Sequence, residues 1–239
     1  MNAMPAYTRS MIVHAALLAC AWAGTSWADT GAATSSTGQD VSSPSALERI
    51  RQEFSAIETV EADFVQTRRT SLLQNDIQAQ GKLYFRAPDS LRLEIAAPIH
   101  SVTIVRGRMI ARFERENGLW KKQVTGRMDS AKTIARQMTA WLQGRFFGED
   151  DDRYEITTMD QKTPLISLIP RNKHLRERLA GIDLQFATPP LRLECLTLRE
   201  THGDETVLRF SNEVRNAPLS DDLFDLSGKS FPRTDADQE

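Results

Sequence analysis

The sequence has little of what disulfide scaffolds, metal sites and nucleic-acid-binding surfaces require. It contains two cysteines, Cys20 and Cys195, and four histidines among 239 residues, which leaves no disulfide framework and no cysteine-based zinc site. Neither sign of charge dominates, because 30 Lys and Arg face 32 Asp and Glu, for a formal net charge of −2. A protein that holds nucleic acid normally has a strongly basic surface, so we expect no nucleic-acid partner.

Motifs of catalysis and of cofactor binding are also missing. There is no Gly-x-Ser-x-Gly nucleophile motif, no P-loop and no dinucleotide-binding fingerprint. His100, His174 and His202 occur singly, in unrelated contexts. The acidic run at 149–152 lacks the glycine and the terminal glutamate of an EF-hand loop. We therefore predict neither an enzyme, nor a metal site, nor a cofactor.

No run of apolar residues is long enough to cross a membrane. The stretch at 11–24 is shorter and more mixed than the roughly 20 apolar residues of a spanning helix. Arg9 precedes it, and the sequence Ser-Trp-Ala at 26–28 places small residues at −3 and −1 of a cleavage site. This arrangement predicts a cleaved signal peptide over residues 1–28, and therefore an exported protein.

The sequence Leu-Leu-Ala-Cys, ending at Cys20, leaves a second interpretation open, in which this cysteine is the acylated first residue of a membrane-anchored lipoprotein. After simple cleavage Cys195 remains, and we expect it to be a buried apolar residue rather than a reactive thiol. Residues 29–44 are rich in Ser, Thr, Gly and Ala, which predicts a flexible tether. One folded domain over 45–226 and a polar tail over 227–239 account for the rest.

Two amphipathic helices are predicted within this domain. The first begins with a capping box at Ser45, continues with apolar residues at helical spacing and ends near Thr59. The second lies within 130–147, where glycines mark its exit. Its apolar side consists of Ile134, Met138, Trp141 and Leu142.

Most of the remaining domain alternates apolar and polar residues with a period of two, which is typical of half-buried strands. Clear examples are 81–86, 91–95 and 182–186. Turn residues interrupt these stretches at short intervals, which predicts about ten strands in an antiparallel meander, either a sandwich or a barrel. The basic run at 171–178 is expected to be a solvated turn or short helix, and contact with nucleic acid or lipid headgroups is the other interpretation.

Four segments follow one another in the predicted domain: VEADFVQT at 60–67, GKLYFRAP at 81–88, LRLEIAAP at 91–98 and NAPLSDDLFDL at 216–226. In this combination they resemble the LolA family of periplasmic outer-membrane lipoprotein carriers. The resemblance covers 47–226. It implies a mainly β fold with helices (α+β), an unclosed antiparallel β-barrel of about eleven strands whose open mouth is covered by helices.

The resemblance also implies a function, the binding of lipoprotein acyl chains in an apolar cavity and their transfer from the inner to the outer membrane. The implied partners are an inner-membrane lipoprotein-releasing transporter and an outer-membrane acceptor, and a monomer is expected. Burying each methylene of an acyl chain is worth about 0.8 kcal/mol, so an apolar cavity is sufficient to hold a long chain. Carriage therefore needs no covalent chemistry. Two alternatives stay open: carriage of a different lipid or lipid-linked product on the same fold, and a non-carrier envelope interaction or sensor module.

In the carrier hypothesis, acyl chains lie between a wall of strand residues and a helical lid. The candidate wall residues are Leu83, Phe85, Leu93, Ile95 and Ile104, and the candidate lid residues are Ile134, Met138, Trp141 and Leu142. Family members often place an arginine directly before the proline of the 81–88 segment, where it engages the lid, but this chain has Ala87 there. Arg86 and Arg92 are therefore the candidate latches, although a shift of one residue in a strand sends a side chain to the opposite face.

Overall fold

The computed structural model describes residues 45–97, 100–123, 130–145, 153–159, 163–229 and 231. These residues belong to one compact unit within Ser43–Glu239. The predicted signal peptide, the tether, the acidic run at 149–152 and most of the predicted tail lie outside the described residues. Among the described helices, none has both the length and the apolar character that crossing a membrane requires.

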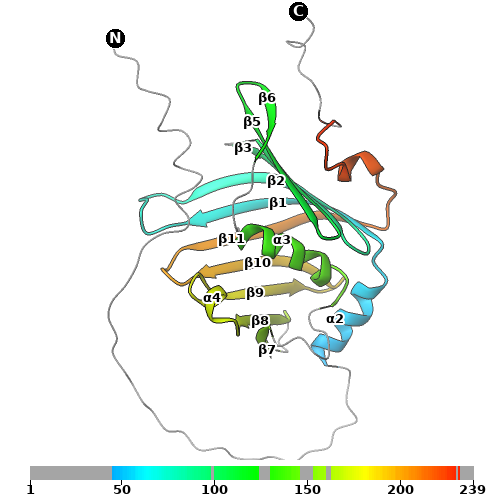
Figure 1. Cartoon of the computed structure of the whole chain (residues 1–239). Coiled ribbons are helices and arrows are strands. Elements are labelled where there is room, and N and C mark those ends of the chain that lie inside the picture. The colour runs from blue at the N-terminus through cyan, green and yellow to red at the C-terminus, as the bar shows by residue number, and fades with distance from the viewer. Residues whose placement is uncertain are drawn as a thin grey trace, which may run out of the picture. The chain divides into compact units, whose positions relative to one another are not determined.

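The described strands form a single open antiparallel sheet of eleven strands (Figure 1), in the order β6-β5-β4-β3-β2-β1-β11-β10-β9-β8-β7. Their bounds are β1 (Thr59–Arg69), β2 (Ile77–Arg86), β3 (Ser90–Ala97), β4 (Ser101–Arg106), β5 (Met109–Glu116), β6 (Leu119–Lys122), β7 (Tyr154–Met159), β8 (Leu165–Pro170), β9 (Leu179–Ala187), β10 (Arg192–Glu200) and β11 (Glu205–Arg215). Because β6 and β7 are the two edges of the sheet, the barrel is not closed. The unclosed eleven-stranded barrel that the family resemblance implies is thus confirmed.

Helices lie on both faces of this sheet. The elements are α2 (Ala46–Ser55), α3 (Ser130–Trp141), the short α4 (Lys173–Arg176) and the 3₁₀ helix η2 (Asp221–Phe224). The predicted capping box is present, since the Ser45 hydroxyl accepts a hydrogen bond from the Glu48 backbone N–H at 3.2 Å. Both long helices end earlier than predicted: α2 stops four residues before Thr59, where β1 already begins, and α3 stops at Trp141.

Alternation along the strands separates two apolar faces of the sheet. The face that packs against α2 and α3, here called the helix face, carries Leu83, Phe85 and Leu91. The opposite face, here called the outer face, carries Val102, Ile104, Ala111 and Phe113, which form a separate hydrophobic cluster. Figure 1 shows α3 lying across the helix face, with α2 beside its end. The helix face is therefore covered by helices, and the outer face is covered around β4 and β5 by a different part of the chain.

The outer face is covered by the C-terminal segment, defined here as residues 216–231. Phe231 is 5% exposed, and its ring centroid lies 4.8 Å from those of Phe113 and Trp120. Phe224 is fully buried in the same cluster. The packed part of the chain therefore continues past Leu226, where the sequence suggested that the domain ends. The sequence did not indicate this packing, because an isolated phenylalanine in a polar tail has no periodic signal.

Candidate functional site

The helix face of the sheet and α3 enclose an apolar interior. Met138, Trp141 and Leu142 are buried, and they share one hydrophobic cluster with the inward side chains of the strands. Ile134, the fourth predicted lid residue, lies within α3, but its side chain is outside the described part of the chain. The three described lid residues therefore point toward the sheet.

The structure brings four of the five predicted wall residues to the helix face. Leu83 and Phe85 are fully buried there, and Leu93 and Ile95 are partly buried against the same cluster. Ile104 is on the outer face instead, because its register partner in β3 is an outward-facing residue, and it packs in the outer cluster. Ile104 is thus separated from the other four by the thickness of the sheet.

The two candidate latch residues hold the C-terminal segment and not the lid. Arg86 forms an ion pair with Asp221, and its guanidinium lies 4.7 Å from the centroid of the Phe224 ring. Arg92 donates a hydrogen bond to the carbonyl oxygen of Leu223 at 3.0 Å. Both side chains alternate with inward-facing neighbours and therefore lie on the outer face, opposite α3. Within the described part of the chain, neither of them forms a hydrogen bond or an ion pair with α3.

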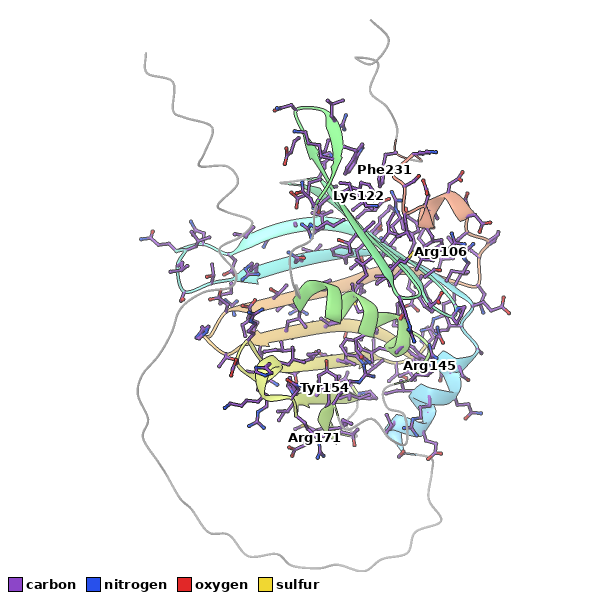
Figure 2. The ribbon with its side chains drawn as sticks, in the orientation of Figure 1. Arg106, Lys122, Arg145, Tyr154, Arg171 and Phe231 are labelled. Carbon is purple, nitrogen blue, oxygen red and sulfur yellow. The ribbon has the colours of Figure 1, made fainter. Side chains whose placement is uncertain are left out.

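The lid is instead tethered by residues at its own end. The side chains of Gln143 and Arg145 both donate hydrogen bonds to the carbonyl oxygen of Pro88, in the turn between β2 and β3, and the Arg145 Nη2 distance is 3.3 Å. Gly144 between them has a φ of +67°, and a Cβ there would lie 2.9 Å from the Arg51 Cα in α2. The sequence indicated that the helix ends at this glycine. No sequence pattern indicated that the side chains on either side of it bind the turn between β2 and β3. Figure 2 shows Arg145 near α2, well apart from Phe231.

A cavity of about 650 Å³ opens on the outer face. It lies between the outward side chains of β1–β3 and the rings of Trp120 and Phe231, and Figure 2 shows Phe231 close to Lys122 at that side of the molecule. Its charged lining residues are Asp63, Lys82, Arg92, Glu94 and Arg115. The cavity combines aromatic surface with charges of both signs, and the sequence did not predict it, because it forms only when the C-terminal segment crosses the strands.

The charges on the floor of this cavity are paired. Asn212 Nδ2 donates a hydrogen bond to the Asp63 carboxylate at 2.8 Å, and Lys82 Nζ lies 3.1 Å from it. These two contacts, the first more than the second, hold the pKa of Asp63 below its usual value. The hydrogen bonds of Lys82 to Asp63 and Glu61 raise the pKa of the lysine. The floor therefore keeps both its negative and its positive charge at neutral pH.

Two other features of the sequence are structural and are not assigned to the site. The basic run at 171–178 includes the exposed helix α4, capped by the Asn172 side chain, in agreement with the expected solvated turn or short helix. Cys195 is buried, as predicted. Among the described residues, no group of three or more His, Cys, Asp or Glu side chains could hold a metal ion.

Residues 55–227, more than two thirds of the chain, match the family model described as outer membrane lipoprotein carrier protein LolA. No curated protein matches the chain.

Several solved structures are similar to this chain at low identity. One is a putative outer membrane lipoprotein-sorting protein domain from Vibrio parahaemolyticus, 10% identical, with a TM-score of 0.45 over 77% of this chain and 97% of that chain. LolA superfamily protein NE2245 from Nitrosomonas europaea is 9% identical, with a TM-score of 0.38 over 77% and 98%. The MucA/MucB complex of Pseudomonas aeruginosa is 12% identical, with a TM-score of 0.41 over 75% and 59%. The family match itself covers the whole sheet and α3, and the chain belongs to the LolA family of outer membrane lipoprotein carrier proteins.

Proposed function

We propose that this protein is a periplasmic carrier that holds the acyl chains of lipoproteins between the helix face of its sheet and α3. The observation that carries this proposal is the continuous apolar cluster shared by the strands, α2 and α3. Membership of the carrier family supports the same class of function. The carrier receives its cargo from an inner-membrane transporter and delivers it to an outer-membrane acceptor.

The contact between α3 and the sheet suits exchange with an acyl chain. Met138, Trp141 and Leu142 bury apolar surface against the sheet, and an acyl chain inserted at this contact covers the same surface with methylene groups. Each buried methylene gains about 0.8 kcal/mol. Entry of cargo therefore replaces one apolar contact by another, and the free energy gained by removing the chain from water drives it.

The polar tether of the lid is small enough to open. Gln143 and Arg145 converge on a single acceptor, the carbonyl oxygen of Pro88. Hydrogen bonds of this kind contribute about 1 kcal/mol each. Burying several methylenes of cargo outweighs this cost, so the tether closes the empty carrier without preventing loading.

The test is a lipoprotein release assay with the purified mature chain, residues 29–239, added to spheroplasts. We expect release of lipoproteins into the soluble fraction, and acylated cargo bound to the protein in mass spectrometry. Met138→Asp places a charge on the buried side of α3 and should abolish both. Met109→Asp is the matched control, because Met109, the first residue of β5, is 61% exposed and should tolerate the same change.

Two results would contradict the proposal, provided that circular dichroism shows both variants folded. One is a wild-type protein that neither binds acyl material nor releases lipoproteins. The other is equal activity of the two aspartate variants. A different lipid found by mass spectrometry would keep the carrier function and change the cargo.

A second candidate function, an envelope interaction module, is favoured by the cavity on the outer face. The cavity presents Trp120 and Phe231 beside paired charges, a combination suited to binding a peptide segment. This function predicts that no acyl chain binds at the helix face. It also predicts an envelope partner whose binding is lost in Trp120→Ala. The spheroplast assay separates it from the carrier, because a partner-binding module releases no lipoprotein.

A further inference from the structure

The indole N–H of Trp141 is buried on the lid without a hydrogen-bond acceptor. The side chain is 2% exposed, and Nε1 has no partner within the described part of the chain. Tryptophan is a donor only, so no rearrangement of protons can satisfy it. Because most buried polar atoms in proteins are hydrogen-bonded, an orphaned donor at this position requires an explanation.

The surroundings of Trp141 explain why it has no partner. Met138 and Leu142 flank it on the lid, and the strands contribute Leu83 and Phe85 to the same cluster. These side chains present no strong acceptor. The donor is therefore buried in a predominantly apolar interior with no described acceptor within hydrogen-bonding distance, and the closed, empty protein bears the cost of an unmade hydrogen bond.

A second polar group lies one helical turn before this tryptophan. Gln137 is only 7% exposed, and residues four positions apart on a helix lie on the same side. Two polar groups that can donate are thus placed along the buried side of a helix that is otherwise suited to apolar contact.

On the basis of the proposed carrier function, we propose that Trp141 binds the carbonyl oxygen of the ester or amide that joins an acyl chain to its headgroup or protein. The ligand class is a neutral carbonyl, because transfer of a carboxylate or phosphate into this apolar interior carries a large desolvation cost. A long-chain ester or amide satisfies the donor and covers the surrounding apolar surface at the same time. Trp141 is then a specificity residue that favours esterified or amidated chains over plain hydrocarbons and free fatty acids.

This role gives Trp141→Phe two effects of opposite direction. The variant keeps an aromatic ring and removes the N–H, so the empty protein no longer buries an unpaired donor, and this gain opposes the cost of the void that the smaller ring leaves. Affinity for an ester should fall at the same time. A residue that only packs the core predicts an equal loss of affinity for esters and hydrocarbons, because the void lies beside either ligand.

The experiment measures binding of two probes to the mature chain, methyl palmitate and the hydrocarbon octadecane. In Trp141→Phe we expect about tenfold weaker binding of methyl palmitate, the loss of one hydrogen bond, with octadecane unchanged. Tyr84→Phe, which removes a polar hydrogen from an aromatic side chain of the outer cluster, is the matched control and should change neither affinity. On wild-type protein, infrared spectra of methyl palmitate labelled with ¹³C at the carbonyl should show a shift to lower frequency that is absent in Trp141→Phe.

Each outcome decides the proposal. Unchanged affinity of Trp141→Phe for methyl palmitate, or an equal loss for both probes, would overturn it while leaving the carrier function intact. An unshifted carbonyl band in the wild-type complex would overturn it without reliance on any variant. Wild-type protein that binds neither probe would contradict the carrier function itself, and the assignment of Trp141 with it.

Discussion

Gln143, two residues after the end of α3, donates a hydrogen bond to the carbonyl oxygen of Pro88 in the turn between β2 and β3. The helix α3 is therefore held by a donor just after its own end and an acceptor on the strand turn. The family resemblance implied the reverse arrangement, an arginine before the proline reaching to the lid. Because this chain has Ala87 at that position, the hydrogen bond is donated by Gln143 beside the lid and accepted by the strand turn.

Removing this tether should loosen the lid without unfolding the sheet. Replacing both Gln143 and Arg145 with alanine deletes the hydrogen bonds to Pro88. At about 1 kcal/mol for each bond, local opening of α3 should increase on the order of tenfold or more. Amide hydrogen exchange of residues 135–142 measures this opening. Lys121→Ala, which removes an exposed ion pair to Glu116, is the control and should leave that exchange unchanged; equal rates in all three proteins would contradict the tether.

Gly81 should be essential for the close approach of the Glu94 backbone and the Phe64 ring to β2. A Cβ at this position would lie 2.1 Å from the Glu94 carbonyl oxygen and 2.3 Å from the Phe64 ring, so Gly81→Ala forces backbone and core apart. Overpacking of this kind costs about 3 kcal/mol or more. Gly203→Ala is the comparison: it meets no atom within 4 Å, and only its φ of +87° opposes the change, at about 1 kcal/mol. Urea unfolding should rank the two variants in this order, and equal stabilities would show that the strands around Gly81 yield.

The C-terminal segment should stabilise the fold as far as Phe231. A chain that ends after Leu226 loses the contacts of this ring with Phe113 and Trp120, and removing a buried phenylalanine costs about 3 kcal/mol. A chain that ends after Phe231 is the matched control and should unfold at the wild-type temperature. Differential scanning calorimetry compares the three chains. If both truncations behave alike, the packing of Phe231 contributes no stability.

Asp63 should make stability depend on pH in the acid range. Its pKa is lowered in the folded protein by the Asn212 hydrogen bond and by Lys82, while in the unfolded chain it is about 3.9. The folded protein therefore binds this proton less readily than the unfolded chain. The resulting stabilisation is complete above about pH 4 and is lost as the pH falls through the lower, folded pKa. Unfolding free energies between pH 7 and pH 2 should fall less steeply in Asp63→Asn than in wild type; parallel curves would contradict this role.

Much of the fold was predictable because its signals are local. The capping box at Ser45 marks the start of α2, and the alternation at 91–95 identifies a strand regardless of its neighbours. The spacing of Met138, Trp141 and Leu142 likewise defined the buried side of α3 before any partner was known. The number of strands and the open barrel came from the family resemblance, because alternation alone does not distinguish a sandwich from a barrel.

What the sequence could not provide depends on contacts between distant segments. A period of two shows that Ile104 and its neighbours face opposite ways, but only the register with β3 shows that Ile104 faces outward. Arg86 and Arg92 lie opposite the lid for the same reason. The tether to Pro88 and the burial of Phe231 bring together residues more than 50 positions apart, and no local pattern encodes such pairs.

The unpaired edges β6 and β7 have a mechanical consequence for loading. In a closed barrel the strand number and stagger fix the diameter, and widening it requires breaking a ladder of backbone hydrogen bonds. Here the sheet can uncurl by small changes of twist at each strand pair while every ladder stays intact. The space under α3 is thus adjustable in width, and the stiffness that opposes this change resides in side-chain packing and not in the backbone.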